Sequence, residues 1–239
     1  MKHLMNLGVL ILLLSFGNCL AQKNKNMNWK EQRKQMLEKQ IIDRGIKSKE
    51  VLEAMMEVPR HEFVPIEYRK FSYADNPLPI GYEQTISQPY IVAYMTEQLR
   101  LKKEDRVLEV GTGSGYQAAV LARICDSVYS IEIIRPLGER AKKILKELGY
   151  GNVRVRIGDG YQGWPSEAPF DAIIVTCAPT DIPEPLEEQL AEGGTMIIPA
   201  GEKWTQVLYL LKKENGKINE KAILPVQFVP MIDEDGEKY

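Results

Sequence analysis

The segment Arg106-Val-Leu-Glu-Val-Gly-Thr-Gly-Ser-Gly-Tyr-Gln-Ala-Ala-Val-Leu-Ala122 decides the fold class of this chain. Its apolar run, residues 107–110, predicts a buried strand, and an alanine- and leucine-rich helix follows. Glycines at alternate positions connect the two: Gly111, Gly113 and Gly115. Glycine can take positive φ and lets a ligand lie against bare backbone, and such a turn at a strand's carboxyl end binds nucleotides in open α/β sheets. Tyr116 replaces the last glycine of the dinucleotide fingerprint, and an ordinary tight turn is the alternative interpretation.

Downstream of this segment, strand and helix patterns alternate along the chain. Buried strands are predicted at residues 127–133, 153–157, 170–177 and 193–199. Helices are predicted between them, at residues 136–148 and around 185–191. This alternation predicts an α/β fold with a doubly wound parallel sheet. The tail differs, because two strand-like runs at 206–213 and 221–229 flank Asn215-Gly216, a strong hairpin signal, so an antiparallel strand pair is expected to end the sheet.

Residues 22–57 carry a helical pattern of apolar positions and are expected to form an N-terminal helical cap. Gly45 interrupts the pattern, and Ser48 is placed to cap a second, short helix. Residues 59–85 are irregular and rich in proline, but their aromatic side chains favour an ordered lid or wall over disorder. A further helix is expected after this stretch, with Ser87 as its N-cap and Pro89 in its first turn.

The charge and the cysteine and histidine content exclude several classes of function. The net charge is −2, so no global basic field favours nucleic acid as a partner. The cysteines share no close spacing, which argues against a zinc site and a disulfide framework: Cys19, Cys125 and Cys177. His61 lies in a Pro-Arg-His turn where a packing role is expected, so neither a metal site nor a Ser-His-Asp triad is predicted.

Residues 1–21 differ from the rest of the chain. A basic start, an apolar run over residues 7–14 and small residues before Ala21 are typical of a secretory signal peptide. The apolar run is too short for a comfortable transmembrane span. We therefore expect cleavage after Ala21, export, and one domain over residues 22–239 that has no membrane attachment. The alternatives are a lipoprotein cut before Cys19 and a cytoplasmic protein with an apolar start.

Carboxylates are expected to surround the glycine turn. Glu132 ends the second predicted strand, where it can accept hydrogen bonds from both hydroxyls of a ribose. Glu109 lies inside the apolar strand, and a buried charge there needs backbone N–H groups or a cationic ligand as its partner. Asp159 follows the third strand, within reach of an adenine amino group. Acids around one turn favour a nucleoside without phosphates, so S-adenosylmethionine is expected in place of NAD; a solvent-exposed carboxylate at position 132 is the alternative.

Further stretches resemble the protein-L-isoaspartate (D-aspartate) O-methyltransferase family. The segment Gly158-Asp-Gly-Tyr-Gln-Gly-Trp-Pro-Ser-Glu-Ala-Pro-Phe-Asp-Ala-Ile173 is similar to the signature of that family. Supporting matches are Val58-Pro-Arg-His-Glu-Phe-Val-Pro65, Thr85-Ile-Ser-Gln-Pro89 and the glycine turn. These flanking stretches are more specific than the turn, which many methyltransferases share. The resemblance covers residues 36 to about 230 and implies a seven-stranded, Rossmann-like methyltransferase sheet.

The resemblance also implies an activity, the repair of damaged proteins. The enzyme would transfer a methyl group from S-adenosylmethionine to the free α-carboxylate of L-isoaspartyl and D-aspartyl residues, leaving S-adenosylhomocysteine. Ser87 matches the active-site serine and is expected to orient the acceptor carboxylate, which is already ionised at neutral pH and needs no strong base. The expected cofactor-binding residues are Gln84, Thr85, Ile86, Glu109, Gly111, Gly113, Gly115, Glu132, Asp159 and Gly160.

Two other functions stay open from the sequence. One is a methyltransferase of the same fold that acts on a small molecule. The other is a secreted binding protein without catalysis, because S-adenosylmethionine is made in the cytoplasm and the sequence pattern predicts export. The expected partners are isoaspartyl-containing proteins and peptides, without nucleic acid, and the chain is expected to be a monomer. The stretch Phe228–Ile232 is expected to fold over the substrate.

Overall fold

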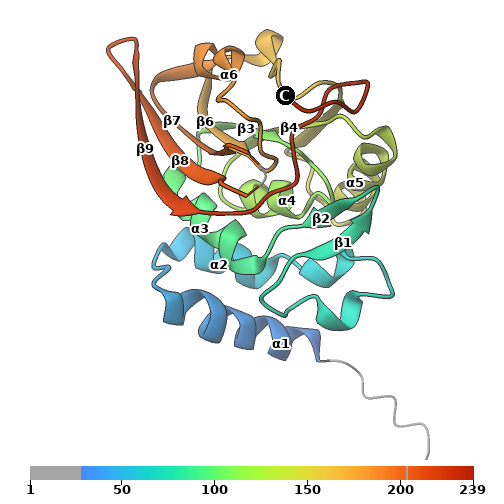
Figure 1. The fold of residues 1–239 in the computed structure, drawn as a ribbon. Helices are drawn as coiled ribbons and strands as arrows, with labels where there is room; N and C mark the ends of the chain where they lie inside the picture. The colour runs from blue at the N-terminus through green and yellow to red at the C-terminus, as the bar shows by residue number, and fades with distance from the viewer. Residues whose placement is uncertain (1–27, 203) are drawn as a thin grey trace, which may run out of the picture.

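A seven-stranded sheet with the order β5-β4-β3-β6-β7-β8-β9 forms the centre of the computed structural model (Figure 1). The structure describes residues 28–202 and 204–239, so the predicted signal peptide at residues 1–21 lies outside the described residues. The strands are β3 (Arg106–Val110), β4 (Ser127–Glu132), β5 (Val153–Ile157), β6 (Phe170–Val175), β7 (Leu190–Ala200), β8 (Val207–Glu214) and β9 (Lys217–Pro225). The first five strands of the sheet order pair in parallel, whereas β8 and β9 are antiparallel. The predicted doubly wound sheet and its antiparallel end are confirmed.

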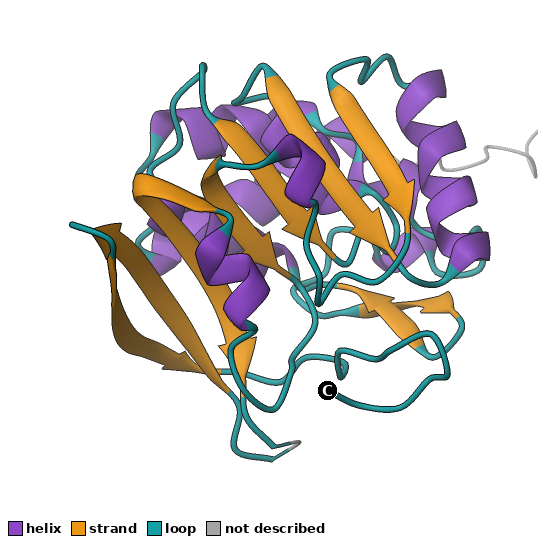
Figure 2. Cartoon of the chain, turned by 90° about the horizontal axis from the view of Figure 1, so that it is seen from above, coloured by secondary structure: helices purple, strands orange, loops and turns teal. Residues whose placement is uncertain are grey.

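Both faces of the sheet are covered, which explains why its central strands are continuously apolar. Successive residues of β3 point to opposite faces, so Val107 and Leu108 belong to different core clusters. Apolar side chains of α3 (Pro89–Leu99), α4 (Tyr116–Ala122) and α5 (Arg135–Glu147) pack in the cluster of Val107. Leu186 of α6 (Glu184–Glu188) packs in the cluster of Leu108. Figure 2 shows the arrowheads of the parallel strands pointing toward the β1–β2 hairpin and the C-terminal loop. The site predicted at the carboxyl ends of the strands therefore lies between these elements.

The turn between β8 and β9 takes the form that its sequence predicts. Asn215 and Gly216 have φ values of 54° and 70°. Two consecutive residues with positive φ match the right-handed twist of a hairpin, and Asn-Gly adopts this conformation readily. Strand β9 begins at Lys217, earlier than expected, because pairing with β8 continues up to the turn.

The N-terminal helical cap packs below the sheet domain (Figure 1). It consists of α1 (Trp29–Met36), a π-helical turn over 37–41, a 3₁₀ turn over 42–44 and α2 (Lys49–Glu57). Gly45 ends the first helical run with φ +98°, a conformation that favours glycine. Ser48 caps α2, accepting a hydrogen bond from Val51 N at 3.4 Å. Both predicted boundaries are confirmed.

The stretch over 59–85 is more regular than its prolines suggest. Residues 60–63 and 69–71 form 3₁₀ turns, and β1 (Leu78–Gly81) pairs with β2 (Gln84–Ile86) as a separate two-stranded sheet. Pro79 fits within β1 because an edge strand does not need every backbone N–H. Tyr82 and Glu83 form the hairpin tip with φ values of 55° and 58°, an uncommon conformation for residues other than glycine.

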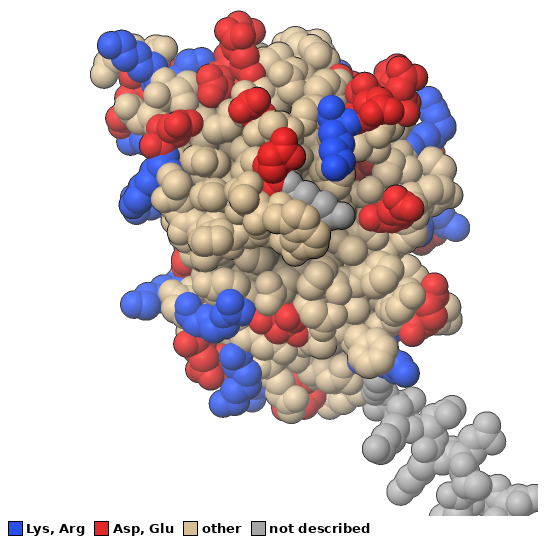
Figure 3. Space-filling view, in the orientation of Figure 1, with Lys and Arg blue, Asp and Glu red and all other residues tan. Residues whose placement is uncertain are grey.

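On the face shown in Figure 3, Lys and Arg side chains lie interspersed with Asp and Glu. Among the helices that the structure describes, none is both long and apolar enough to cross a membrane.

Candidate functional site

A cavity at the carboxyl ends of the central strands brings together most of the residues that the sequence predicts. We call it the turn cavity. Its predicted members are Gln84, Thr85, Ile86, Ser87, Gly111, Gly113, Glu132 and Gly160. Residues 229–232 complete its wall, so much of the tail stretch expected over the substrate lies at this site. Three predicted ligands, Glu109, Gly115 and Asp159, are not among the described residues that line it.

The glycine turn exposes its backbone to the cavity at two of its three glycines. Gly111 and Gly113 have φ values of 95° and 52°. A Cβ at Gly111 would lie 2.5 Å from Thr176 Oγ1, so no other residue fits there without displacing that side chain. Gly115 has a different task, because a Cβ on it would press on Ala141 and Leu145 of α5 at 3.3 and 3.4 Å. Its small size lets α4 start close to α5.

Glu132 joins the glycine turn to the next strand–helix connection. Its Oε2 accepts a hydrogen bond from Gly113 N at 2.6 Å, and its Oε1 accepts one from Ile134 N at 2.9 Å. Burial raises the pKa of this carboxyl, and the two backbone donors oppose the rise. A carboxylate has about four lone-pair positions, so acceptor capacity remains for the hydroxyls of a ribose in the cavity.

Glu109 lies behind the turn and not in the turn cavity. It is fully buried, and Ser130 Oγ donates a hydrogen bond to its Oε2. Ser130 Oγ also lies 2.5 Å from Thr112 Oγ1, which links the acid to the glycine turn. Burial raises the pKa of Glu109 to about 8, although the Ser130 hydroxyl and the Ala118 amide favour the ionised form. The charged acid expected from the sequence is therefore neutral at neutral pH, because a proton takes the place of a cationic partner.

The protonation of Glu109 predicts a specific pH dependence of stability. An unfolded glutamate releases its proton above about pH 4.5, whereas folded Glu109 keeps it up to about pH 8. Its contribution to the free energy of unfolding is thus complete below pH 4.5 and is lost as the pH rises through 8, with a slope approaching about 1.4 kcal/mol per pH unit. Glu109→Gln removes this titration, so its free energy of unfolding should fall less steeply between pH 5 and 8. Urea unfolding at several pH values measures both slopes, and equal slopes would contradict a protonated Glu109.

The carboxylate of Asp159 accepts hydrogen bonds from two tyrosines that the sequence analysis did not link to it. Its Oδ1 accepts a hydrogen bond from Tyr161 N at 2.9 Å, and its Oδ2 accepts one from the Tyr239 hydroxyl at 2.8 Å. The following residue, Gly160, does line the turn cavity. A Cβ at Gly160 would lie 2.5 Å from Val110 Cγ1, so this turn packs directly on β3.

Ser87 does not cap α3, contrary to the sequence-based prediction. The helix begins at Pro89, and Gln88 is its N-cap. The capping carboxylate comes from a distant loop, because Asp75 Oδ1 accepts the Tyr90 amide at 3.4 Å and Asp75 Oδ2 accepts Gln88 Nε2 at 2.8 Å. Within the described residues, the Ser87 hydroxyl has no hydrogen-bond partner, and Ser87 lines the cavity. The hydroxyl is therefore available to a ligand.

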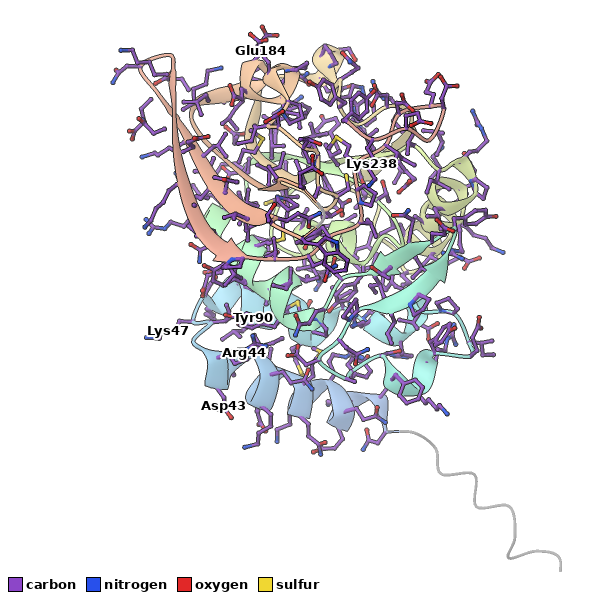
Figure 4. All side chains as sticks on the ribbon, in the orientation of Figure 1. Asp43, Arg44, Lys47, Tyr90, Glu184 and Lys238 are labelled. Carbon is purple, nitrogen blue, oxygen red and sulfur yellow. The ribbon has the colours of Figure 1, made fainter. Side chains whose placement is uncertain are left out.

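Arg44 fixes Asp75 from the helical cap. Its Nη1 lies 2.7 Å from Asp75 Oδ2, and its guanidinium stacks 3.4 Å from the ring centre of Tyr90. Figure 4 shows Arg44 and Tyr90 next to each other where the cap meets α3. The cap therefore supports the carboxylate that replaces Ser87 at the helix start.

Arg60 is a functional candidate that sequence reasoning missed. It is fully buried, and its Nη2 and Nε donate to Ser87 O and Ser72 O, each at 2.8 Å. Its Nη1 has no partner among the described residues, and burial lowers the guanidinium pKa to about 10. The Pro-Arg-His turn drew attention only to His61, which packs as expected, stacked 4.5 Å from Trp29. No local sequence signal distinguishes Arg60 from a solvent-exposed arginine, because its burial depends on contacts with residues 12 and 27 positions away.

A second hollow, which we call the side groove, continues from the turn cavity toward the surface. The two share Thr85, Ser87, Thr176, Val229 and Pro230. The groove is further lined by parts of the hairpin tip, the loop after β7 and the stretch after β9, including Glu83, Gly201, Gln206 and Phe228. Ser87 therefore lies where the two hollows meet, and a ligand in either of them could contact it.

Metal and thiol chemistry find no support among the described residues. No group of at least three His, Cys, Asp or Glu side chains is arranged there to hold a metal ion. Cys177 lines the turn cavity, but burial raises the pKa of its thiol far above neutrality. The thiol is therefore a small packing group and not a nucleophile.

Comparison with known proteins assigns this geometry to a family. The family described as protein-L-isoaspartate(D-aspartate) O-methyltransferase (PCMT) matches residues 31–236. The chain belongs to this family. Among PCMT relatives, the protein-L-isoaspartate O-methyltransferase of Opitutus terrae is 55% identical over 229 residues, which cover 95% of this chain and 97% of the relative. That of Gloeobacter violaceus is 52% identical over 205 residues, covering 85% of this chain and 100% of the relative.

Solved PCMT structures share the fold. A PCMT from Plasmodium falciparum, solved in complex with S-adenosyl-L-homocysteine, superimposes with a TM-score of 0.74 at 30% identity and covers 83% of this chain and 97% of that one. A second protein-L-isoaspartate O-methyltransferase superimposes with the same TM-score, 0.74, at 34% identity. The match covers 82% of this chain and 65% of that chain.

Proposed function

We propose that the protein is a repair enzyme that transfers a methyl group from S-adenosylmethionine to the free α-carboxylate of L-isoaspartyl and D-aspartyl residues in damaged proteins. Membership of the PCMT family supports the reaction, and the S-adenosyl-L-homocysteine in the Plasmodium relative supports the cofactor. The observation in this chain that carries the proposal is the position of Ser87, where the turn cavity opens into the side groove.

The residues of the turn cavity fit S-adenosylmethionine. Its described lining contains the carboxylate of Glu132 and no Lys or Arg side chain. A dinucleotide or a nucleoside triphosphate would need positive charge or several free amides for its phosphates, whereas a nucleoside with a sulfonium and an amino group suits an acidic lining. Glu132 would hold the ribose, and the bare backbone at Gly111 and Gly113 would lie along the methionine part.

The remaining task of the protein is alignment. When bound, S-adenosylmethionine supplies an electrophilic methyl group, and an ionised carboxylate can attack it without a general base. The hydroxyl of Ser87 would hold the acceptor carboxylate in the side groove in line with the methyl group. Residues 229–232 would exclude water from this point, since they line the turn cavity.

Matched peptides that differ only in Asp or isoaspartate test the proposal. With labelled S-adenosylmethionine, the isoaspartyl peptide should be methylated and the Asp peptide should not. Ser87→Ala should lower turnover about 10- to 100-fold, the value of one hydrogen bond to a charged group, without changing S-adenosylhomocysteine affinity. Equal labelling of both peptides would instead favour a methyltransferase for another acceptor, and absence of cofactor binding would favour a binding protein without catalysis.

The cellular location of the enzyme and its oligomeric state are also part of the proposal. We infer that residues 1–21 direct export, that residues 22–239 form the methyltransferase domain, and that this domain acts as a monomer. The sequence pattern of the first residues supports export, and a cytoplasmic location is the alternative. Cell fractionation and size-exclusion chromatography decide these points.

A further inference from the structure

The tail after the turn cavity folds back on itself and returns to the site. Asp233 N donates to Glu237 O at 2.8 Å, and Ile232 pairs with Lys238 as an antiparallel bridge. Tyr239 N then donates to Met231 O at 3.2 Å. The position of Tyr239 is therefore set by backbone pairing within the tail.

The loop that follows β6 also holds Tyr239. Thr180 donates to the Tyr239 carbonyl through its backbone N at 2.9 Å and through its Oγ1 at 2.8 Å. This anchoring aims the Tyr239 side chain at the turn that follows β5. Its ring stacks on Tyr161, with ring centres 4.2 Å apart and an angle of 20° between the planes. Its hydroxyl donates to Asp159 Oδ2 at 2.8 Å.

Both ends of this connection reach the lining of the turn cavity. Met231, which accepts the Tyr239 amide, lines it, and so does Gly160, the neighbour of Asp159. Tyr239 thus ties the tail wall of the cavity to the turn after β5. The match to the PCMT family covers residues 31–236, so Asp159 lies within the matched residues and Tyr239 lies beyond them.

We propose that Tyr239, which lines the side groove, is a positioning residue of the cofactor site: it holds the carboxylate of Asp159, the neighbour of the cavity residue Gly160, in one orientation toward the amino group of the cofactor's adenine. This inference rests on the proposed function, because it requires an adenine nucleoside in the turn cavity. With one oxygen of Asp159 held by Tyr161 N and the other by the Tyr239 hydroxyl, the carboxylate has a single orientation and still has lone pairs for an exocyclic amino group. A ligand whose base carries an oxo group in place of the amino group would place the oxo oxygen, a hydrogen-bond acceptor, against the Asp159 carboxylate, which is also an acceptor.

Calorimetric titration of the full chain with S-adenosylhomocysteine and with S-inosylhomocysteine tests the inference. Tyr239→Phe keeps the ring stack and removes only the hydroxyl, so the variant should fold normally, which thermal unfolding without ligand checks. We expect about tenfold weaker S-adenosylhomocysteine binding. We also expect the preference for the amino-bearing base over the oxo-bearing base to shrink by a similar factor, which a purely structural role would not change.

Two further variants make the outcome decisive. Tyr209→Phe is the matched control, because Tyr209 lies in β8 and its hydroxyl makes no hydrogen bond to another described residue; it should bind like the parent chain. In Asp159→Asn, the added Tyr239→Phe change should have no further effect on base preference. If the parent chain binds S-adenosylhomocysteine and Tyr239→Phe leaves affinity and preference unchanged, the role of Tyr239 is wrong while the proposed function stands. If the parent chain itself fails to bind, the proposed function falls and the inference falls with it.

Discussion

Replacing Glu132 with alanine is expected to weaken S-adenosylhomocysteine binding at least 100-fold. The substitution removes the ribose acceptor and leaves the amides of Gly113 and Ile134 without their carboxylate partner. A hydrogen bond from a ribose hydroxyl to a charged acceptor is worth about 1.5–3 kcal/mol, and tenfold in affinity corresponds to about 1.4 kcal/mol, so the loss of two such bonds accounts for the effect. Isothermal calorimetry with S-adenosylhomocysteine measures the change.

Two companion variants separate the role of Glu132 from general effects of charge removal. Glu132→Gln keeps an oxygen for one of the two amides but turns an N–H₂ group toward the other, so its affinity should lie between those of the parent and Glu132→Ala. Glu139→Ala removes an acid from the surface of α5, where it pairs with Lys142, and should bind like the parent. An affinity of Glu132→Ala within threefold of the parent would exclude Glu132 as the residue that organises the site.

Replacing Arg60 with methionine is expected to lower methyl transfer to an isoaspartyl peptide at least 30-fold while the protein stays folded. Among the described residues, the buried guanidinium contacts no carboxylate, so its burial is costly, and an apolar side chain of similar length recovers that cost. The substitution also removes two hydrogen bonds, to Ser72 O and Ser87 O, and each loss costs about 1–3 kcal/mol of stability. The two effects are of similar size, so stability should change little, whereas Ser87 loses the donor that fixes its peptide plane.

The test of Arg60 compares three measurements on the same variants. Peptide kcat/KM should fall, S-adenosylhomocysteine affinity should stay constant, and the midpoint of thermal unfolding should move by only a few degrees. Arg60→Lys keeps the charge and can reach only one of the carbonyls, so it should retain part of the activity. Arg69→Met, which removes a partly exposed arginine beside Glu62, is the control. A parallel loss of cofactor affinity and peptide turnover would show that Arg60 supports the fold as a whole and not the acceptor side.

The parts of the structure that could be predicted from the sequence are those set by local chemistry. The apolar strand before the glycines, the Asn215-Gly216 turn and the caps at Gly45 and Ser48 each depend on residues a few positions apart. The number of strands was accessible only through the family resemblance, and their order was not predicted, because strand neighbours such as β3 and β6 are separated by β4, β5, α4 and α5.

The features that could not be predicted depend on contacts between distant residues. The start of α3 is capped by Asp75, from a separate loop, so the spacing of Ser87 and Pro89 indicated the wrong cap. The contact between Asp159 and Tyr239 spans 80 positions, and nothing in either segment alone indicates the other. The protonation of Glu109 depends on complete burial, which a single acid in an apolar strand suggests but does not establish.

The remote cap on α3 also has a consequence for protein engineering. Asp75 satisfies the start of α3, so the Ser87 side chain is not needed as its cap, and within the described residues the Ser87 hydroxyl makes no hydrogen bond and lines the two hollows. Substitution libraries at this single position can therefore change which acceptor the enzyme prefers without a compensating mutation to preserve the scaffold. Ser87 is then one of several side chains that position 87 could carry. The loop that carries Asp75 must stay unchanged, because Asp75 caps α3.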